Sequence, residues 1–302
     1  MSHLKEPLHP EGPKLSRIVA GMWRLDEWSY TQKELIGWIE KCMDFGVTSF
    51  DHADIYGDYR CESLFGAVLK EKPGLRGQIE LVSKCGICLI SNKKPFHKIT
   101  HYNTTADHII SSVQQSLENL NTDYLDLLLI HRPSPLMDAD ETAAGLNRLI
   151  RSEIVRNVGV SNFTPSQFNL LQSRLDRPLV TNQVEFSLLH ADPVYDGTFD
   201  QMQTHRIRPI VWSPFGGGRL FSSDETRAVR VRKVLNKLAV KYQADIDQIA
   251  LAWLLTFPSR PFPVLGTGKI ERIEKAVGAL EIDLERQDWF ALLEAYHGEP
   301  VP

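Results

Sequence analysis

The sequence is poor in cysteine and contains no long apolar run. Four cysteines in 302 residues are too few for a disulfide framework in a chain of this length, which favours a reducing compartment. No segment approaches the run of about 18 apolar residues that a membrane-spanning helix needs. Residues 1–17 are polar and proline-rich and lack the apolar centre of a signal peptide. We therefore expect a soluble cytoplasmic protein with no membrane partner.

The sequence also lacks a long basic run. Its net charge is -4 with histidine neutral, which argues against the extended polyanion-binding surface that nucleic acid requires. A small molecule is the better expectation for its partner. The GxGxxG turn with which a doubly wound sheet binds dinucleotides is absent as well.

What the sequence does contain is a regular alternation of strand-like and helix-like segments. After an irregular N-terminus, eight apolar segments are each followed by an amphipathic pattern, with a long loop after the third segment to about Asn103. The eight expected strands span residues 17–25, 47–53, 79–84, 124–131, 154–161, 179–186, 207–213 and 261–266. No composition break marks a second domain, so we predict one (β/α)8 TIM barrel domain over residues 1–302, with a doubly wound sheet as the competing architecture.

Three of these strands end in ionisable side chains, and a tyrosine follows the first of them. Asp51, Lys84 and His131 lie at the ends of strands 47–53, 79–84 and 124–131, and Tyr56 lies in the loop beyond the first of them. In a parallel barrel such strand ends converge on one face. Tyrosine is a natural proton donor, but its usual pKa of about 10 is high for transfer near neutrality. We expect the Lys84 ammonium to lower that pKa, Asp51 to keep Lys84 charged, and His131 to orient a carbonyl or share the proton. For each residue taken alone a structural role is the better expectation, and only the set as a whole favours catalysis.

Seven segments, FDHADIYG, SKCG, LLLIHRP, GVSNF, NQVEFS, WSPFGGG and PVLGTG, occur in an order and spacing that closely resemble the aldo-keto reductase superfamily over nearly the whole chain. The resemblance, which is to bacterial-type NADPH-dependent members, implies carbonyl reduction with a nicotinamide dinucleotide and without metal or flavin. It matches Asp51, Tyr56, Lys84 and His131 to the family's catalytic tetrad, with Tyr56 as general acid.

The same resemblance implies where a cofactor is held. Ser161, Asn162 and Gln183 match the residues that hold the nicotinamide carboxamide, and Trp212 stands where an aromatic side chain, more often tyrosine, stacks on the ring. The positions matched to the ribose, the phosphates and the adenosine end are Gly21, Met22, Trp23, Ser213, Pro214, Phe215, Gly216, Gly217, Gly218, Gly266, Thr267, Gly268, Lys269 and Arg272.

Part of this set has a physical reason of its own. We expect the glycine run to offer backbone N–H groups to phosphate, and Lys269 with Arg272 to bind a 2'-phosphate, so that NADP(H) is the cofactor. Gly268 and Ala276 depart from the polar residues frequent at their positions, which weakens the expected adenine contacts. Each of these assignments has a purely structural alternative. SNFT could be only a helix start, the glycine run a flexible loop, Trp23 a core residue, and the basic residues a solvated helix face.

A second pattern, Cys85 and Cys88 followed by His97 and His101, has the look of a zinc site. The segment between the pairs is shorter than the about 12 residues of a zinc finger, and Cys85 directly follows Lys84. We therefore expect no metal, and we leave a redox role for the two cysteines open.

Together these features predict an NADPH-dependent aldehyde or ketone reductase. The alternatives are a nucleotide-sensing regulatory subunit with negligible turnover and a metal-dependent barrel hydrolase, although no HxH stands at a strand end. The physiological carbonyl compound stays open, as does oligomeric state, monomer or weak oligomer, because the expected pocket loops at 86–102 and 218–226 follow no spacing rule.

Overall fold

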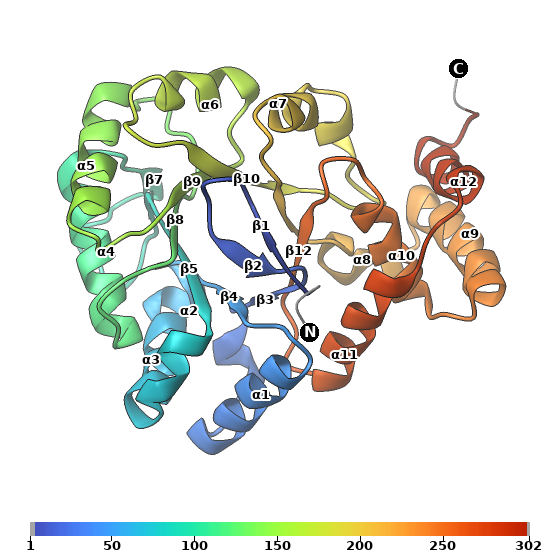
Figure 1. The fold of residues 1–302 in the computed structure, drawn as a ribbon, viewed down its shortest axis with the longest axis horizontal. Helices are drawn as coiled ribbons and strands as arrows, with labels where there is room; N and C mark the ends of the chain where they lie inside the picture. Colours follow the sequence, from blue (N-terminus) through green and yellow to red (C-terminus); the bar gives the residue numbers. More distant parts are fainter. Residues whose placement is uncertain (1–3, 301–302) are drawn as a thin grey trace.

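The computed structural model describes residues 4–300, and eight parallel strands form a closed barrel at its centre (Figure 1). Around the barrel the strands run in chain order, each paired with the next, and the last pairs with the first. The strands are β3 (Val19–Gly21), β4 (Ser49–Asp51), β5 (Glu80–Cys85), β8 (Leu127–Ile130), β9 (Val158–Ser161), β10 (Leu179–Glu185), β11 (Ile210–Trp212) and β12 (Phe262–Leu265). The predicted (β/α)8 barrel is confirmed, and the doubly wound sheet is excluded.

Helices follow every barrel strand and cover the barrel from outside (Figure 1). They are α1 (Gln32–Asp44), α3 (Cys61–Glu71), α4 (Ala106–Leu120), α5 (Ala139–Arg151), α6 (Pro165–Gln172), α7 (Thr198–Thr204), α8 (Arg219–Ser222), α9 (Thr226–Tyr242), α10 (Ile246–Leu255), α11 (Ile270–Gly278) and α12 (Arg286–His297). Local sequence sets their starts: Thr31 and Thr164 both form capping boxes with the residue three positions later. No helix within residues 4–300 is long and apolar enough to cross a membrane.

Strand alternation divides the apolar side chains into two cores. Small and branched residues such as Val82, Leu129 and Ile210 fill the barrel interior, and residues of opposite parity, such as Leu128 and Val211, pack against the helices. Lys84 lies two residues after Val82, and His131 lies two residues after Leu129, so both share the inward-facing side of their strands. The polar side chains at the strand ends therefore continue the interior rows of the barrel toward its C-terminal face.

Two short hairpins were not predicted. The N-terminal segment expected to be irregular contains strands β1 (Lys5–Pro7) and β2 (Lys14–Ser16), which pair antiparallel. Leu8 and Leu15, which flank its turn, are fully buried in the interior core. The expected long loop after β5 likewise contains a hairpin of β6 (Ile87–Cys88) and β7 (His101–Tyr102). Strands of two or three residues are too short to leave a readable alternation in the sequence.

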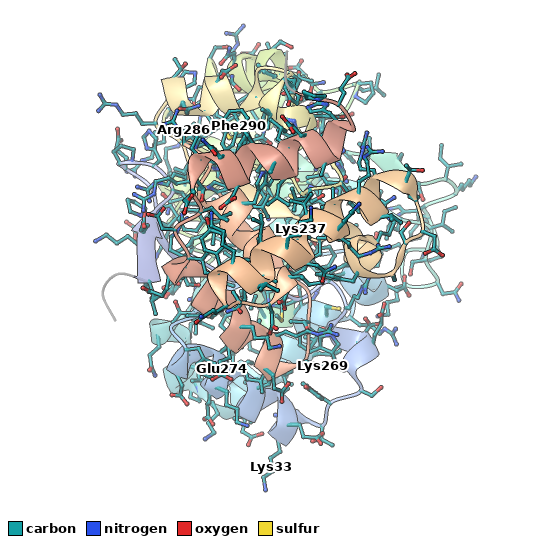
Figure 2. The ribbon with its side chains drawn as sticks, turned by 90° about the vertical axis from the view of Figure 1, so that its right-hand side faces the viewer. Lys33, Lys237, Lys269, Glu274, Arg286 and Phe290 are labelled. Atoms are coloured by element: carbon teal, nitrogen blue, oxygen red, sulfur yellow. The ribbon has the colours of Figure 1, made fainter. Side chains whose placement is uncertain are left out.

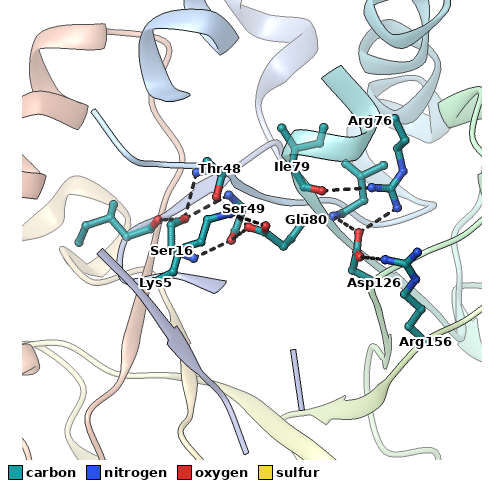
Figure 3. Close-up of polar contacts among 11 residues, drawn as sticks. Lys5, Ser16, Thr48, Ser49, Arg76, Ile79, Glu80, Asp126 and Arg156 are labelled. Carbon is teal, nitrogen blue, oxygen red and sulfur yellow. Dashed lines mark hydrogen bonds and ion pairs between the residues drawn. The ribbon is translucent and has the colours of Figure 1, made fainter. Parts of the chain in front are cut away.

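Polar networks close the N-terminal end of the barrel, at the starts of the strands (Figure 3). The Glu80 carboxylate accepts hydrogen bonds from Lys5 Nζ at 2.7 Å and Ser49 Oγ at 2.7 Å. Asp126 accepts from Arg76 at 2.8 Å and Arg156 at 3.1 Å. Charged groups at this end are thus paired with one another, and an open reactive site is expected at the opposite, C-terminal end, as in other barrels of this type.

A substitution of Gly66 in α3 tests how closely α3 packs against α4. A Cβ at Gly66 would lie 1.9 Å from the carbonyl oxygen of Asn119 in α4, so Gly66→Ala should lower the free energy of unfolding by about 1 to 3 kcal/mol through overpacking. Gly37→Ala in α1 is the matched control, because a Cβ there meets nothing within 4 Å and should add about 0.5 to 1 kcal/mol. Urea denaturation of both variants measures the difference, and equal stabilities would contradict the close packing of α3 on α4.

Candidate active site

The four predicted catalytic residues lie together at the C-terminal end of the barrel. Asp51 ends β4, Lys84 lies in β5, His131 directly follows β8, and Tyr56 begins the short helix α2 (Tyr56–Tyr59). Lys84 Nζ lies 2.6 Å from Asp51 Oδ2 and 3.1 Å from the Tyr56 hydroxyl. The Tyr56 and His131 rings meet edge to face with centroids 5.9 Å apart. The structure therefore brings together residues as far apart in the sequence as Asp51 and His131, which are 80 positions apart.

Lys84 is the centre of this arrangement. Its side chain is fully buried, and its third hydrogen bond goes to the carbonyl oxygen of His52 at 2.7 Å, so all three ammonium protons have acceptors. Burial alone would lower the pKa of Lys84, but the charge and hydrogen bonds of Asp51 and Tyr56 outweigh burial, and the pKa is raised. Lys84 is therefore a permanent cation at neutral pH.

The pKa of Tyr56 differs from the prediction. Lys84 does act to lower it, as expected, but burial of the phenol is the larger effect, and Asp51 adds to it, so the net pKa is raised. The prediction of a lowered pKa is wrong because it left out the cost of placing a phenolate away from water. Tyr56 is consequently held in its protonated form, which is the form that a general acid needs.

His131 is held neutral. Burial, reinforced by the positive charges of Lys84 and Arg132, places the pKa of His131 well below its usual range. Its Nδ1 atom is buried and has no hydrogen-bond partner among residues 4–300. A neutral imidazole beside the Tyr56 ring can donate or accept one hydrogen bond toward a ligand, which favours an orienting role over a charge-carrying one.

Gln183 makes a contact that was not predicted. Its Nε2 donates to Asp51 Oδ1 at 2.9 Å, across the barrel. Val180 belongs to the interior core. Gln183, three residues later, also points inward, as its bond to Asp51 shows, and the pairing of β10 with β9 shifts register between Leu179 and Asn182. A bulge there re-aims the strand, and it was not visible in the sequence.

Ser161, Asn162 and Trp212 form a connected group next to Gln183. Ser161 Oγ donates to the Gln183 carbonyl oxygen at 2.9 Å, and Asn162 Nδ2 donates to Ser161 Oγ at 2.7 Å. Trp212 Nε1 donates to Asn162 Oδ1 at 3.0 Å, and Asn162 adopts a left-handed backbone with φ 60°. The four side chains predicted to surround the nicotinamide are thus neighbours, and they present amide and hydroxyl groups as well as an aromatic face.

On the other side of the tetrad lie Gly21, Met22 and Trp23. Met22 is buried, and its backbone N–H donates to the Asp51 carbonyl oxygen at 2.9 Å. Trp23 is 57% exposed, so the alternative that it is a plain core residue is wrong. A Cβ at Gly21 would lie 2.7 Å from Val264 Cγ1, which explains the glycine by packing against β12.

The turn from Ser213 to Gly218, which includes Pro214 and Phe215, follows β11. Gly216, Gly217 and Gly218 all have positive φ angles, which only glycine adopts without strain. The expectation that the run exposes its N–H groups is wrong in part, because the Gly216 N–H donates to the Ser213 carbonyl and the Gly218 N–H to the Phe215 carbonyl. Open space lies beside Gly217 and Gly218, where a Cβ would meet nothing within 4 Å.

The adenosine-end segment follows β12. Lys269 and Arg272 are exposed, and neither takes part in an ion pair among residues 4–300; Figure 2 shows Lys269 on the same outer face as Glu274 of α11. The Lys269 N–H is turned inward to Thr267 Oγ1 at 3.2 Å. Open space also adjoins Gly266, whereas a Cβ at Gly268 would lie 2.9 Å from the Trp28 ring. The residue type at Gly268 therefore follows from packing, and Ala276 is likewise buried in the core.

These donors fit an anionic dinucleotide. Along the C-terminal end of the barrel lie two cations, Lys269 and Arg272, that no described carboxylate pairs with. Open space lies beside Gly217, Gly218 and Gly266, and an amide-rich group surrounds Gln183. Amide and hydroxyl groups suit a carboxamide, and unpaired cations suit a phosphate.

The cysteine and histidine pattern does not assemble into a metal site. Cys85 and Cys88 are buried, and burial raises the pKa of both thiols, which disfavours the thiolate form that binds zinc. The His97 and His101 rings lie edge to face at 5.3 Å. Over the described part of the chain, no group of three or more His, Cys, Asp or Glu side chains is placed to hold a metal ion.

One residue at the site was overlooked in the sequence. Arg132 follows His131 in the segment LLLIHRP, and its guanidinium carbon lies 5.5 Å from the centroid of the Trp212 ring. Its charge acts on the pKa of both Tyr56 and His131. The signal available in the sequence was its position directly after a predicted strand-end histidine.

Comparison with known structures defines the class of barrel. The crystal structure of the thermostable aldo-keto reductase Tm1743 in complex with the inhibitor epalrestat superposes with a TM-score of 0.82 at 26% identity, covering 97% of this chain and 99% of that chain. Glycerol dehydrogenase AKR11B4 from Gluconobacter oxydans, at 21% identity, supports the fold alone, with a TM-score of 0.86 and coverage of 100% and 98%.

The sequence comparisons show the family. The Aldo/keto reductase family model matches residues 17–297, and the chain belongs to this family of oxidoreductases. Oxidoreductase YdhF of Escherichia coli (strain K12) is 50% identical over 297 residues, with 97% of each chain covered. The 6-dehydroglucose reductase of Agrobacterium fabrum is 45% identical over 289 residues, covering 95% of this chain and 96% of the relative.

Proposed function

We propose that the protein reduces an aldehyde or ketone to an alcohol with NADPH, with Tyr56 as the general acid. The observation that carries this proposal is the buried Lys84 ammonium, which contacts the Asp51 carboxylate and the Tyr56 hydroxyl at 2.6 and 3.1 Å. When bound, the cofactor supplies a hydride to the carbonyl carbon. The reaction consumes the carbonyl compound, NADPH and one proton and yields the alcohol and oxidised NADP, and Tyr56 delivers the proton to the carbonyl oxygen.

The chain's own residues have separate tasks in this scheme. Lys84 stabilises the phenolate that Tyr56 becomes as its proton leaves, and Asp51 keeps Lys84 in place and charged. Neutral His131 donates a hydrogen bond to the carbonyl oxygen and so orients the carbonyl toward Tyr56. Ser161, Asn162, Gln183 and Trp212 hold the nicotinamide, and Gly21, Met22 and Trp23 with the turn Ser213, Pro214, Phe215 and Gly216 to Gly218 line its ribose and phosphates.

A panel of aldehydes and ketones, followed through the loss of NADPH absorbance, tests the proposal. The panel includes 6-dehydroglucose because a 45% identical relative is named for its reduction. Tight NADPH binding with no turnover across the panel would favour the alternative, a nucleotide-sensing regulatory subunit. The complete tetrad weighs against that alternative, since a sensor has no use for a proton donor held by a buried ammonium.

The cofactor preference is a separate prediction. Lys269 and Arg272 follow β12, are matched to the 2'-phosphate position and form no ion pair with any described residue; Gly266, Thr267 and Gly268 precede them. A charge-assisted hydrogen bond contributes about 1.5 to 3 kcal/mol where it is desolvated, equivalent to about 10- to 150-fold in affinity, and exposure reduces this toward the lower end. Arg272→Leu should therefore weaken NADPH binding by roughly 10-fold or more and NADH binding little.

Fluorescence titration of both cofactors against both proteins measures this preference. Arg286→Leu in α12 is a matched control, because it removes an exposed arginine that Figure 2 shows at the other end of this outer face from Lys269. Added salt should erode the wild-type preference for NADPH, since it screens a dianionic phosphate. Equal affinities of the wild type for the two cofactors would leave Lys269 and Arg272 as a solvated helix face.

A further inference from the structure

Arg132 occupies a distinctive position beside the tetrad. It directly follows His131 at the end of β8 and is partly buried. Its guanidinium lies over Trp212 at 5.5 Å and its charge lowers the pKa of Tyr56. Arg132 is thus close to the proton donor, to the neutral histidine and to the aromatic side chain of the site.

The guanidinium of Arg132 has no acceptor for its N–H groups within residues 4–300. It makes no hydrogen bond and no ion pair there, although arginine presents five donors. The Asp51 carboxylate pairs with other groups, because one of its oxygens accepts from Lys84 and the other from Gln183. An anionic ligand here would gain a charge-assisted hydrogen bond to a partly buried guanidinium that no side chain of residues 4–300 occupies.

Arginines at the opposite end of the barrel are compensated by carboxylates. Arg76 and Arg156 flank Asp126, and Arg208 and Arg260 both bind Glu6. The positive charge of Lys84 is likewise balanced by Asp51. Arg132 therefore supplies, at the reactive end, a positive charge that no carboxylate of the described chain pairs with, next to residues that contact the carbonyl in the proposed reaction.

We propose that Arg132 determines specificity for carbonyl substrates that carry a carboxylate, or a similarly compact anion, within a few bonds of the reacting carbonyl. This inference rests on the proposed carbonyl reduction and names a substrate class for the same site. Because His131 and Arg132 are consecutive, they can contact one substrate at two points. His131 and Tyr56 bind its carbonyl oxygen, and the planar guanidinium of Arg132 binds its anionic group.

The geometry of arginine is suited to this task. Two parallel N–H groups of the guanidinium match the two oxygens of a carboxylate, which fixes orientation as well as affinity. The contact with the Trp212 ring restrains the guanidinium before a ligand binds, so less side-chain conformational entropy is lost on binding. A neutral carbonyl compound gains neither the charge nor the paired hydrogen bonds.

Turnover with paired aldehydes tests the proposal. The pairs are 4-carboxybenzaldehyde with methyl 4-formylbenzoate and succinic semialdehyde with methyl 4-oxobutanoate, which differ in charge at two distances from the aldehyde. Wild-type kcat/KM should favour the acid of at least one pair, and Arg132→Gln should reduce that preference by about 10- to 100-fold, mainly through KM. Arg132→Lys, which keeps the charge but loses the fork, should retain an intermediate preference.

The control is Arg151→Gln, which removes a 66% exposed arginine paired with Asp176 at the end of α5 and should leave the preference unchanged. If the acid-to-ester ratio of both pairs is the same in wild type and Arg132→Gln, the proposed specificity role is wrong. Continued reduction of the esters in that case would show that carbonyl reduction itself stands.

Binding of a nonreacting anion tests the role of Arg132 independently of turnover. Benzoate and the uncharged benzamide are titrated calorimetrically into protein saturated with oxidised NADP, so that Lys269 and Arg272 are already engaged if they hold the cofactor. Benzoate should bind more tightly to the wild type than benzamide, and Arg132→Gln should abolish the difference. Equal binding of the two compounds to the wild type, or a benzoate preference that survives in the variant, would overturn the proposal even if no aldehyde is reduced.

Discussion

Replacing Tyr56 by phenylalanine is expected to reduce turnover by about 100-fold or more while leaving NADPH affinity nearly unchanged. The substitution removes one hydroxyl, which is the proton donor in the proposed reaction and an acceptor for Lys84 Nζ at 3.1 Å. The ring keeps its edge-to-face contact with His131, so the shape of the site is preserved. Steady-state turnover and fluorescence titration of NADPH separate the two effects.

Tyr195→Phe is the matched control for this experiment. Tyr195 is 58% exposed, and its hydroxyl bonds to His297 at 2.7 Å near the C-terminal helix α12. It should leave turnover unchanged because that hydroxyl has no contact with the tetrad. Near wild-type turnover in Tyr56→Phe, with single-turnover measurements showing that chemistry limits the rate, would remove Tyr56 from the role of acid.

The grouping of Asp51, Lys84 and His131 was predictable because it follows from strand periodicity, whereas the place of Tyr56 beside them was implied by the family resemblance. Lys84 and His131 lie at the ends of apolar rows whose inward-facing members, Val82 and Leu129, form the interior core. Parallel strands bring such ends to one face whatever the loops between them do. Strand-end position in the sequence was therefore sufficient to group residues that are far apart in the chain.

Contacts that depend on local backbone irregularity were not predictable. The inward turn of Gln183 toward Asp51 requires a register shift in β10, and the internal hydrogen bonds of Gly216 and Gly218 depend on the specific turn that these glycines adopt. Gly268 was read as a departure from a polar pattern, whereas contact with Trp28, from a segment distant in the chain, explains it. Each of these features is set by tertiary packing, which leaves no mark on hydrophobic periodicity.

The pKa of Tyr56 illustrates the same limit. The residue types predicted the direction in which Lys84 acts, but the net direction depends on how deeply the phenol is buried, and burial is the larger effect. A raised pKa means that Tyr56 keeps its proton at neutral pH. Turnover in the reduction direction should therefore fall only on the alkaline side, as pH rises through the pKa of Tyr56 and the donor is lost.

Replacing Lys84 by methionine should then have the second large effect, on both activity and stability. Lys84 acts to lower the pKa of Tyr56, so its removal should move the alkaline limit of the pH profile to higher pH, and turnover should fall because the phenolate is no longer stabilised as the proton leaves. The change also leaves the buried Asp51 carboxylate without its cation, which should cost about 3 to 5 kcal/mol of unfolding free energy.

The double variant Asp51→Asn/Lys84→Met separates these two consequences. It removes both members of the buried pair, and an asparagine can keep a hydrogen bond to Gln183 through its side-chain oxygen, so much of the lost stability should return. Activity should not return, because Tyr56 still lacks the ammonium. Urea denaturation and pH profiles of the single and double variants provide the measurement. If Lys84→Met keeps the wild-type pH profile, Lys84 does not act on the proton donor; if turnover recovers together with stability in the double variant, Lys84 serves only to neutralise Asp51.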